Sequence, residues 1–311
     1  MPLLQADAGE HAGQRVGNMV EGIVVVVAND HQPAPVQTRA GSGVARSLDR
    51  ARRHCRDYAA FGAINALTQE DEGMNGLQNS SRAPGLLLGE DVELPNDSRI
   101  GANVVIHSGT QIGSGVTIQD GAIVGKSPHL GPRSSASRER PLAAVLGDGA
   151  AVLAGAIVFA SARLGQGAIV GDQSHVRERS VVGAGSVIGR GSAVDNDVLI
   201  GAGVRIQTNC YLTGHTRIED HVFVGPGVTM ANDNAMARHP PDVPLRGPWL
   251  ERACRIGAGA VLCPGIRIER EAFVAAGSVV AADVPAQAVV MGIPARHVRD
   301  VPEDDLIQHW L

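Results

Sequence analysis

The sequence predicts an all-β fold, a solenoid wound from six-residue units, and its hydrophobic pattern is the first evidence. Between Leu146 and Met230 every sixth residue is aliphatic or methionine without exception. The same period recurs from Leu88 to Val124 and from Ile256 to Val280. A period of six matches neither the 3.6 residues of a helical turn nor the alternation of an ordinary strand, so it indicates a short structural repeat.

Two further positions of the repeat support this fold. Four residues after each aliphatic comes a small or β-branched residue, as at Ala150, Ser180 and Val204, and we expect both positions to point inward. Directly after the aliphatic stands a frequent glycine, as at Gly183, which we expect to form a corner because it has no Cβ to clash in unusual φ/ψ. Three such units close one triangular turn, and turns stack through parallel hydrogen bonding.

This pattern resembles the hexapeptide-repeat proteins with a left-handed parallel β-helix, over residues 86–292. The left hand is implied by the resemblance, since chain geometry normally favours right-handed crossovers. We predict a β-helix domain over residues 74–292 and a short C-terminal tail over 293–311. Residues 1–73 carry no repeat and form an N-terminal extension. That extension is either a small or disordered segment or is not translated, in which case synthesis begins at Met74.

Composition limits the partners and the compartment. The 311 residues carry a net charge of −5, so the basic excess needed to bind nucleic acid is absent. The four cysteines form no CxxC pair, and Cys210 falls at an inward position of the repeat, which favours a reducing cytoplasm. No segment has the pattern of a signal peptide or membrane span, and we expect no membrane partner.

The repeat is interrupted twice, and each interruption predicts an inserted loop. The spacing from Val124 to Leu146 is 22 residues and that from Met230 to Ile256 is 26, and neither is a multiple of six. Loops on a regular solenoid are where sites tend to be assembled. The first insertion offers Arg133, Arg138 and Arg140, either in a solvated loop or as phosphate contacts. The second carries prolines and Trp249, which we expect to pack against a neighbouring coil or subunit.

Three polar residues occupy one slot of the repeat just before the second insertion. Asn209, His215 and His221 each stand three residues after an aliphatic, and this slot is expected to face outward on three successive faces of one turn. A single subunit does not easily bring such residues together. A homotrimer packed side by side would pair groups from two chains.

The stretch IQTNCYLTGHTRIEDHVFVGP with the following Asn232 and Asp233 resembles the sugar-nucleotide N-acetyltransferases of the hexapeptide family. That resemblance implies that Asn209, Asn232 and Asp233 bind the acceptor sugar. The ending VVAADVPAQAVVMGIPARHV resembles that of members that use acetyl-CoA, which implies acetyl-CoA as co-substrate and no metal.

The expected cofactor contacts lie in the last coils. Backbone N–H groups around Ala258, Ala276 and Gly277 are candidates to hold the thioester and its developing oxyanion. Arg296 and Arg299 are candidates for the CoA phosphates, with solvated tail residues as the alternative.

His215 is the candidate general base, because an imidazole titrates near neutrality and acetyl transfer requires the acceptor to lose a proton. In hexapeptide transferases with a catalytic histidine, that residue stands two after the aliphatic, whereas His215 stands three after. A surface histidine is therefore the competing interpretation of His215. We interpret His175 and His221 as ordinary outward residues.

The sequence thus predicts an acetyl-CoA-dependent acyltransferase that acetylates an amino group of a nucleotide-linked amino sugar. One alternative is O-acetylation of a sugar or serine-like acceptor. A second is a zinc enzyme like the γ-type carbonic anhydrases, although the spacings of His175, His215 and His221 do not fit its ligand pattern. A third is a scaffold solenoid without activity.

Overall fold

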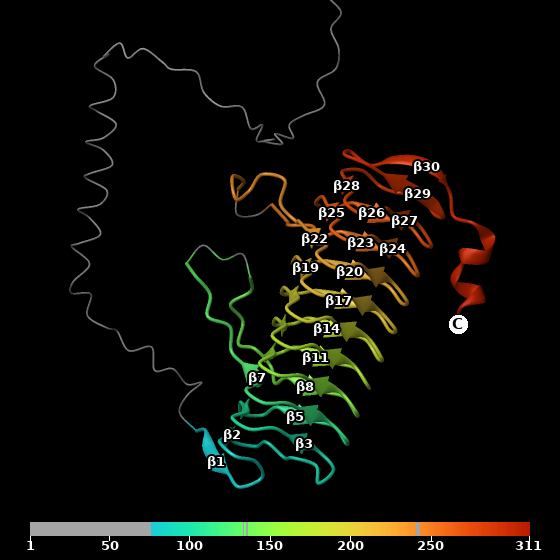
Figure 1. Ribbon diagram of the computed structural model, residues 1–311. Helices are drawn as coiled ribbons and strands as arrows, with labels where there is room; N and C mark the ends of the chain where they lie inside the picture. The colour runs from blue at the N-terminus through green and yellow to red at the C-terminus, as the bar shows by residue number, and fades with distance from the viewer. Residues whose placement is uncertain (1–75, 133, 135, 241–242) are drawn as a thin grey trace, which may run out of the picture. The chain divides into compact units, whose positions relative to one another are not determined.

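The left-handed parallel β-helix predicted from the repeat is confirmed. A computed structural model describes residues 76–132, 134, 136–240 and 243–311. In it, short strands from successive turns stack along one axis and form three sheets, one for each side of the prism (Figure 1). The predicted extension 1–73 and Arg133 lie outside the described residues. The C-terminal tail carries two 3-10 helices, η1 (Glu303–Asp305) and η2 (Ile307–His309).

Each sheet is a stack of short strands, named below in the order in which they are hydrogen-bonded. Sheet A contains β1 (Gln78–Ser80), β2 (Leu86–Leu88), β4 (Val105–Ile106), β7 (Ile123–Lys126), β10 (Ile157–Phe159), β13 (His175–Val176), β16 (Ala193–Val194), β19 (Tyr211–Leu212), β22 (Thr229–Met230), β25 (Val261–Leu262) and β28 (Val279–Val280). Sheet B contains β3 (Arg99–Ile100), β6 (Thr117–Ile118), β9 (Ala151–Val152), β12 (Ile169–Val170), β15 (Val187–Ile188), β18 (Arg205–Ile206), β21 (Phe223–Val224), β24 (Arg255–Ile256), β27 (Phe273–Val274), β29 (Ala288–Met291) and β30 (Arg296–Asp300). Sheet C contains β5 (Gln111–Ile112), β8 (Val145–Leu146), β11 (Arg163–Leu164), β14 (Val181–Val182), β17 (Leu199–Ile200), β20 (Arg217–Ile218), β23 (Trp249–Leu250) and β26 (Arg267–Ile268).

One turn of the helix takes three six-residue units, as the repeat predicts. Ile157 of β10 pairs with His175 of β13, which places equivalent residues eighteen apart on neighbouring turns. The chain visits the sheets in the order B, A, C, and neighbouring strands are parallel except in the terminal pairs β1–β2 and β29–β30. We call the three bends the B–A, A–C and C–B corners, after the sheets that they connect.

The core consists of the two inward columns expected from the sequence. Large aliphatics such as Ile188, Ile206 and Leu212 are fully buried, and burial of each contributes about 1.5–3 kcal/mol. Four serines of the small-residue column, Ser174, Ser180, Ser186 and Ser192, are buried as well, and each donates to a backbone carbonyl. The Ser180 hydroxyl donates to the Asp195 carbonyl at 2.6 Å, so this polar atom is not left unpaired in the core.

The glycine after the aliphatic has a different role from the predicted one. Gly183 is not among the residues with positive φ, so this slot is not the left-handed corner. A Cβ on Gly183 would lie 2.3 Å from the carbonyl carbon of Gly201 on the next turn, so the slot requires glycine because the coils approach closely. The left-handed backbone lies instead three residues after the aliphatic, for example at Gly185 with φ 64°.

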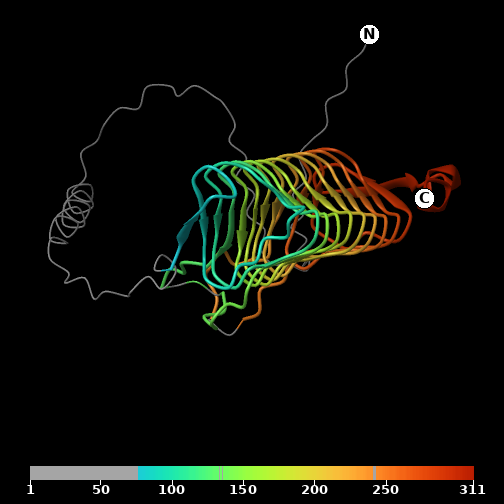
Figure 2. The same cartoon turned by 90° about the horizontal axis from the view of Figure 1, so that it is seen from below.

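Both insertions leave the β-helix at the A–C corner. The first loop, residues 127–144, joins β7 to β8, and the second, residues 231–248, joins β22 to β23. The two loops project from the same edge of the solenoid (Figure 2). The repeat resumes at the buried Leu250, six residues before Ile256. Among the described residues, no helix has the length and apolar character needed to span a membrane.

Trp249 packs against neighbouring coils, as predicted. Its indole Nε1 donates to Glu219 Oε1 at 3.0 Å, and the guanidinium of Arg267 lies 4.5 Å from the ring centroid. The aromatic residue is therefore held on the outer face of sheet C, directly after the second loop.

Candidate functional site

The slot that carries Asn209, His215 and His221 is the left-handed position of the corners. Their φ angles are 58°, 65° and 60°, and all three point away from the core, as predicted. Asn209 lies at the B–A corner, His215 at the A–C corner and His221 at the C–B corner. Within one chain the three residues therefore face three different directions.

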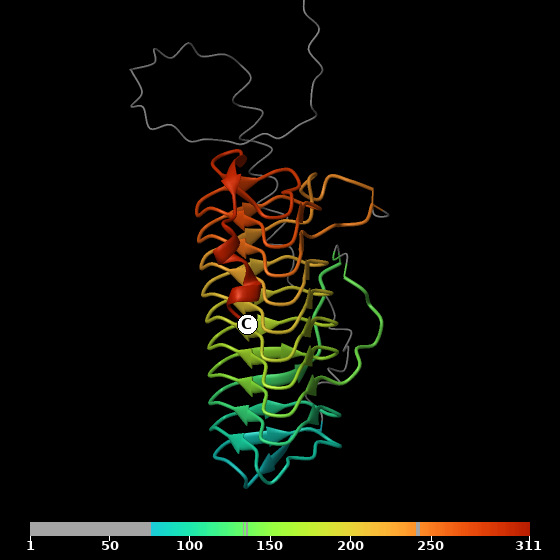
Figure 3. The ribbon, with the colours of Figure 1, turned by 90° about the vertical axis from the view of Figure 1, so that its right-hand side faces the viewer.

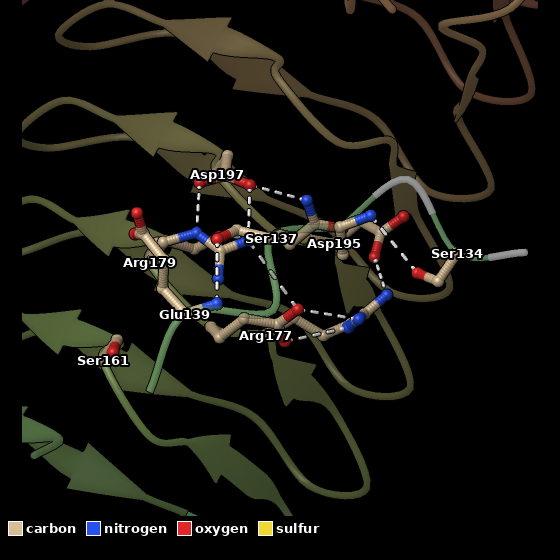
Figure 4. A network of polar contacts seen from close by, with 12 residues as sticks. Ser134, Ser137, Glu139, Ser161, Arg177, Arg179, Asp195 and Asp197 are labelled. Atoms are coloured by element: carbon tan, nitrogen blue, oxygen red, sulfur yellow. Dashed lines mark hydrogen bonds and ion pairs between the residues drawn. The ribbon is translucent and has the colours of Figure 1, made fainter. Parts of the chain in front are cut away.

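The A–C corner between the two loops carries a ladder of charged residues on successive turns. Arg177, Glu178 and Arg179 form one rung, and Asp195, Asn196 and Asp197 form the next. Arg177 Nη1 donates to Asp195 Oδ1 at 2.6 Å, and Arg179 donates to both carboxylate oxygens of Asp197. In Figure 4, Ser134, Ser137 and Glu139 of the first loop lie beside this ladder.

Glu178 is a fully buried carboxylate at the centre of the ladder. It accepts hydrogen bonds from Arg177 Nε at 3.2 Å and Nη2 at 2.8 Å, and Arg179 Nη2 lies 3.9 Å from it. A buried charge is tolerated only when it is paired and hydrogen-bonded, and two guanidinium groups meet that need here. This corner is therefore a rigid polar platform beneath the loops.

The pKa values of Asp197 in the ladder and of the adjacent Tyr211 are both shifted. Burial raises the pKa of Asp197, but hydrogen bonds from Arg179 and Asn196 and the nearby positive charges outweigh burial and lower it overall. His215 is one of those charges when it is protonated. Burial and the charge of Asp195 raise the pKa of Tyr211, whose hydroxyl donates to Asp195 Oδ2 at 3.1 Å.

His215 occupies the next rung, directly below the second loop. Its backbone N–H donates to the Asn196 carbonyl at 3.3 Å, and its side chain is exposed. The preceding residue, Gly214, accepts a hydrogen bond from Asn232 Nδ2 at 3.2 Å. His215 and Asn232, both predicted site residues, thus lie at the same corner on adjacent turns.

Asp233 organises the second loop from within. Its carboxylate accepts the N–H groups of Ala235 at 2.7 Å and Ala237 at 2.6 Å, and His239 Nε2 lies 3.3 Å from it. The bond from Ala237, assisted by that from Ala235 and by His239, lowers the pKa of Asp233. Both carboxylate oxygens of Asp233, a residue predicted to bind the substrate, therefore accept hydrogen bonds from the loop itself.

The predicted cofactor residues gather elsewhere, at the B–A corner. Ala258, Ala276 and Gly277 are exposed there on successive turns, in the same column of coils as Asn209. The Gly277 N–H donates to the Ala258 carbonyl at 2.8 Å, so that donor is occupied by the coil. Sheet A therefore separates the group at Asn209 from the group at His215.

The remaining predicted residues lie apart from both corners. Arg296 is exposed on β30, where its Nη1 donates to the Ala295 carbonyl at 2.9 Å. His175 is half-buried on sheet A, and burial lowers its pKa, with Asp195 acting in the opposite sense. In the described part of the chain, no group of three or more His, Cys, Asp or Glu side chains converges as a set of metal ligands.

The sequence-based prediction missed the ladder of Arg177, Glu178, Arg179, Asp195 and Asp197. The signal was present, since Arg177 and Asp195, like Arg179 and Asp197, are eighteen residues apart, one full turn. Opposite charges at that spacing lie side by side on a parallel β-helix.

Comparison with known proteins supports the fold and shows sequence similarity to hexapeptide-repeat transferases. Residues 91–126 and 197–232 match the family described as "Bacterial transferase hexapeptide (six repeats)", and residues 250–282 match "Hexapeptide repeat of succinyl-transferase". The solved UDP-N-acetylglucosamine acyltransferase from Campylobacter jejuni superposes with a TM-score of 0.52 at 16% identity, covering 65% of this chain and 75% of that one. That likeness concerns the fold.

Two curated relatives are acetyltransferases. Galactoside O-acetyltransferase of Lactococcus lactis is 33% identical over 119 residues, which are 35% of this chain and 56% of that protein. The 2,3,4,5-tetrahydropyridine-2,6-dicarboxylate N-acetyltransferase of Staphylococcus aureus is 39% identical over 83 residues, 27% of this chain and 32% of that protein. The chain thus spans little more than half, or less, of the relatives that it matches. The protein therefore has a left-handed β-helix fold built on hexapeptide repeats, and segments of its sequence match hexapeptide-repeat transferases and acetyltransferases.

Proposed function

We propose that the protein is an acetyl-CoA-dependent acetyltransferase in which His215 at the A–C corner is the general base. The observation that carries this proposal is the position of His215, exposed on a rigid polar ladder and directly below the second loop. The sequence kinship with two acetyltransferases supports the reaction class.

The chemistry assigns a task to each group. The acceptor nitrogen or oxygen attacks the thioester carbonyl while His215 removes its proton, and collapse of the tetrahedral intermediate expels the CoA thiolate, which the imidazolium can protonate. The backbone N–H groups of Ala258 and Ala276, two residues exposed at the B–A corner, are the proposed oxyanion donors. Gly277, whose N–H is already bonded, contributes the close approach that a missing side chain permits.

A homotrimer is the proposed assembly, because the two groups of site residues lie at opposite edges of sheet A. Side-by-side packing would bring the A–C corner of one chain against the B–A corner of the next. Tyr211 and Val261, large exposed side chains on sheet A, are candidates for that contact.

Mixing two inactive variants tests the shared site. His215→Asn and Asn209→Ala chains, denatured together and refolded, should form mixed trimers in which some sites combine an intact His215 with an intact Asn209. We expect activity to return only after mixing, and light scattering should give the mass of three chains. A monomeric mass, or no recovery from a mixture that has formed mixed trimers, contradicts the shared site.

The proposed acceptor is the amino group of a nucleotide-linked amino sugar, which rests on the match of Asn209, Asn232 and Asp233 to the sugar-nucleotide N-acetyltransferases. O-acetylation of a sugar is the second candidate, favoured by the 33% sequence identity over 119 residues with galactoside O-acetyltransferase. A thiol-release screen of amino-sugar nucleotides, simple sugars and serine with acetyl-CoA distinguishes the two. Metal analysis of the purified protein tests the zinc alternative separately.

His215→Asn is the sharpest test of the base, because asparagine tolerates the left-handed backbone of this slot and does not titrate near neutrality. We expect turnover to fall well over tenfold with acetyl-CoA affinity retained. Gln173→Asn is the matched control, since Gln173 has the same backbone conformation, φ 58°, in another coil. Unchanged turnover in His215→Asn removes this residue from the mechanism.

A further inference from the structure

The end of the predicted C-terminal tail, residues 301–311 and called the tail below, lies along the outer face of sheet B (Figure 3). The Val301 N–H donates to the Gln287 carbonyl at 2.7 Å, and the Ile307 N–H donates to Glu271 Oε1 at 3.1 Å. These bonds fix the tail at two points along its course. Between the tail and the sheet remains a hollow of about 340 Å³.

The hollow combines basic and aromatic side chains. The β-helix contributes Arg205, His221, Phe223 and Arg255, and the tail contributes Asp305, Ile307 and Trp310. Glu271 also lines it, but its Oε1 is used by the tail. None of the residues that line the hollow comes from the A–C corner or from the Ala258 column, so the hollow is separate from both groups of the proposed acetyltransferase site.

Arg255 is the unusual residue of this hollow. Its Nε and Nη2 are closed to solvent and have no hydrogen-bond partner in the described part of the chain. The guanidinium lies 5.2 Å from the centroid of the Phe273 ring, and Nη1 lies 3.9 Å from Asp305 Oδ2, beyond hydrogen-bond distance. Two buried donors are thus left unsatisfied, an arrangement that natural proteins seldom keep without a reason.

The Nε–Nη2 edge is the one with which a guanidinium grips an oxyanion. Arg179 shows this in the same molecule, donating from Nε at 2.7 Å and Nη2 at 2.8 Å to the two oxygens of Asp197. A phosphate group offers oxygens at a spacing that the same fork fits. Arg205 adds a second positive charge to the lining, and Asp305, half-exposed on the tail, is the nearest carboxylate to Arg255.

We propose that the hollow beneath the tail is a phosphate-binding site, in which the Nε–Nη2 edge of Arg255 holds the phosphate and Arg205 supports it. Because that edge is closed to solvent, phosphate binding requires a local rearrangement around Arg255, in which Asp305, 3.9 Å from Nη1, gives up its pairing with the guanidinium. Asp305 is thus an internal competitor of the ligand. Trp310 and Phe223 flank the position, so an organic phosphate with a flat apolar part fits better than inorganic phosphate.

Calorimetric titration of the full chain tests the site, with inorganic phosphate and adenosine monophosphate as probes at constant ionic strength. We expect Arg255→Gln to weaken phosphate at least tenfold and Arg255→Lys, which keeps the charge but loses the fork, to weaken it less. Asp305→Asn should strengthen binding several-fold, because it removes the competing carboxylate. Arg99→Gln is the matched control, since Arg99 occupies the equivalent outward position of sheet B in β3.

Melting temperatures of all variants show whether a loss of binding reflects loss of the fold. Equal phosphate affinity in the wild type and in folded Arg255→Gln overturns the proposal. So does the absence of binding in both the wild type and Asp305→Asn. Acetyl transfer is measured separately, so an inactive enzyme that still binds phosphate through Arg255 contradicts only the proposed function.

Discussion

Arg179 and Asp197 form a two-point ion pair across neighbouring turns, with Nε–Oδ1 and Nη2–Oδ2 distances of 2.7 and 2.8 Å. Both residues have left-handed backbone, with φ 61° and 59°, in a slot that many other coils fill with glycine. The pair lies between the first loop and His215. The strain of two side chains in left-handed corners is therefore combined with a fixed charge geometry beside the proposed base.

Replacing Asp197 by asparagine should make the free energy of unfolding depend less on pH in the acid range. The folded-state pKa of Asp197 is lowered, so its contribution is present above the unfolded pKa of about 3.9 and is lost as pH falls through the lower folded value. We expect Asp197→Asn to lower the free energy of unfolding by about 1 kcal/mol at pH 7. Urea unfolding should show the difference shrinking below pH 4. Asp304→Asn, at an exposed tail carboxylate, should show no such change.

Because the coils stack closely, alanine substitutions at two glycines of one coil should destabilise the protein to very different degrees. Gly183→Ala places a Cβ 2.3 Å from backbone atoms of Gly201 and should cost about 3 kcal/mol or more. Gly185→Ala meets no atom within 4 Å and has only its φ of 64° against it, which costs about 1 kcal/mol. Thermal unfolding of the two variants measures the contrast. Equal destabilisation would show that corner strain, and not close approach, sets the requirement for glycine.

Most of the fold was predictable because one residue in six carries the signal. The inward columns follow from spacing alone, and Ile206 and Cys210 are buried as expected. Leu250 was missed as a core position because the second loop shifts the register before it and a single aliphatic after a loop is not a period. The reason for Gly183 was wrong because a contact with Gly201 eighteen residues away leaves no local trace.

The candidate site was predictable in parts. The slot of His215 and Asn209 follows from the repeat, whereas their separation by sheet A depends on which corner each hexad reaches. The pairing of Arg177 with Asp195 needs the eighteen-residue turn, which the six-residue period implies only once the prism is accepted. The internal bonds of Asp233 depend on the path of an irregular loop, for which no periodicity exists.

Asp233→Asn should loosen the second loop. The substitution replaces a carboxylate whose two oxygens accept hydrogen bonds from the N–H groups of Ala235 and Ala237. It also removes the negative charge 3.3 Å from His239 Nε2. We expect faster tryptic cleavage after Arg238, which is exposed in the same loop, with the melting temperature of the β-helix nearly unchanged. Asn234→Ala alters the exposed neighbour and should leave the cleavage rate as it is. Equal rates in both variants would show that these bonds do not hold the loop.

The cysteines of the β-helix should differ in reactivity with maleimide at pH 8. Cys254 is fully buried in the small-residue column, and burial, with the charges of Glu219 and Glu251, raises its pKa far above the usual value. Because the thiolate is the reacting form, Cys254 should stay unmodified in the native protein and react only on unfolding. Cys263 is half-buried, and burial raises its pKa as well, so it should react slowly but measurably. Peptide mass spectrometry follows each site, and labelling of Cys254 at the rate of Cys263 would show that the last coils open without global unfolding.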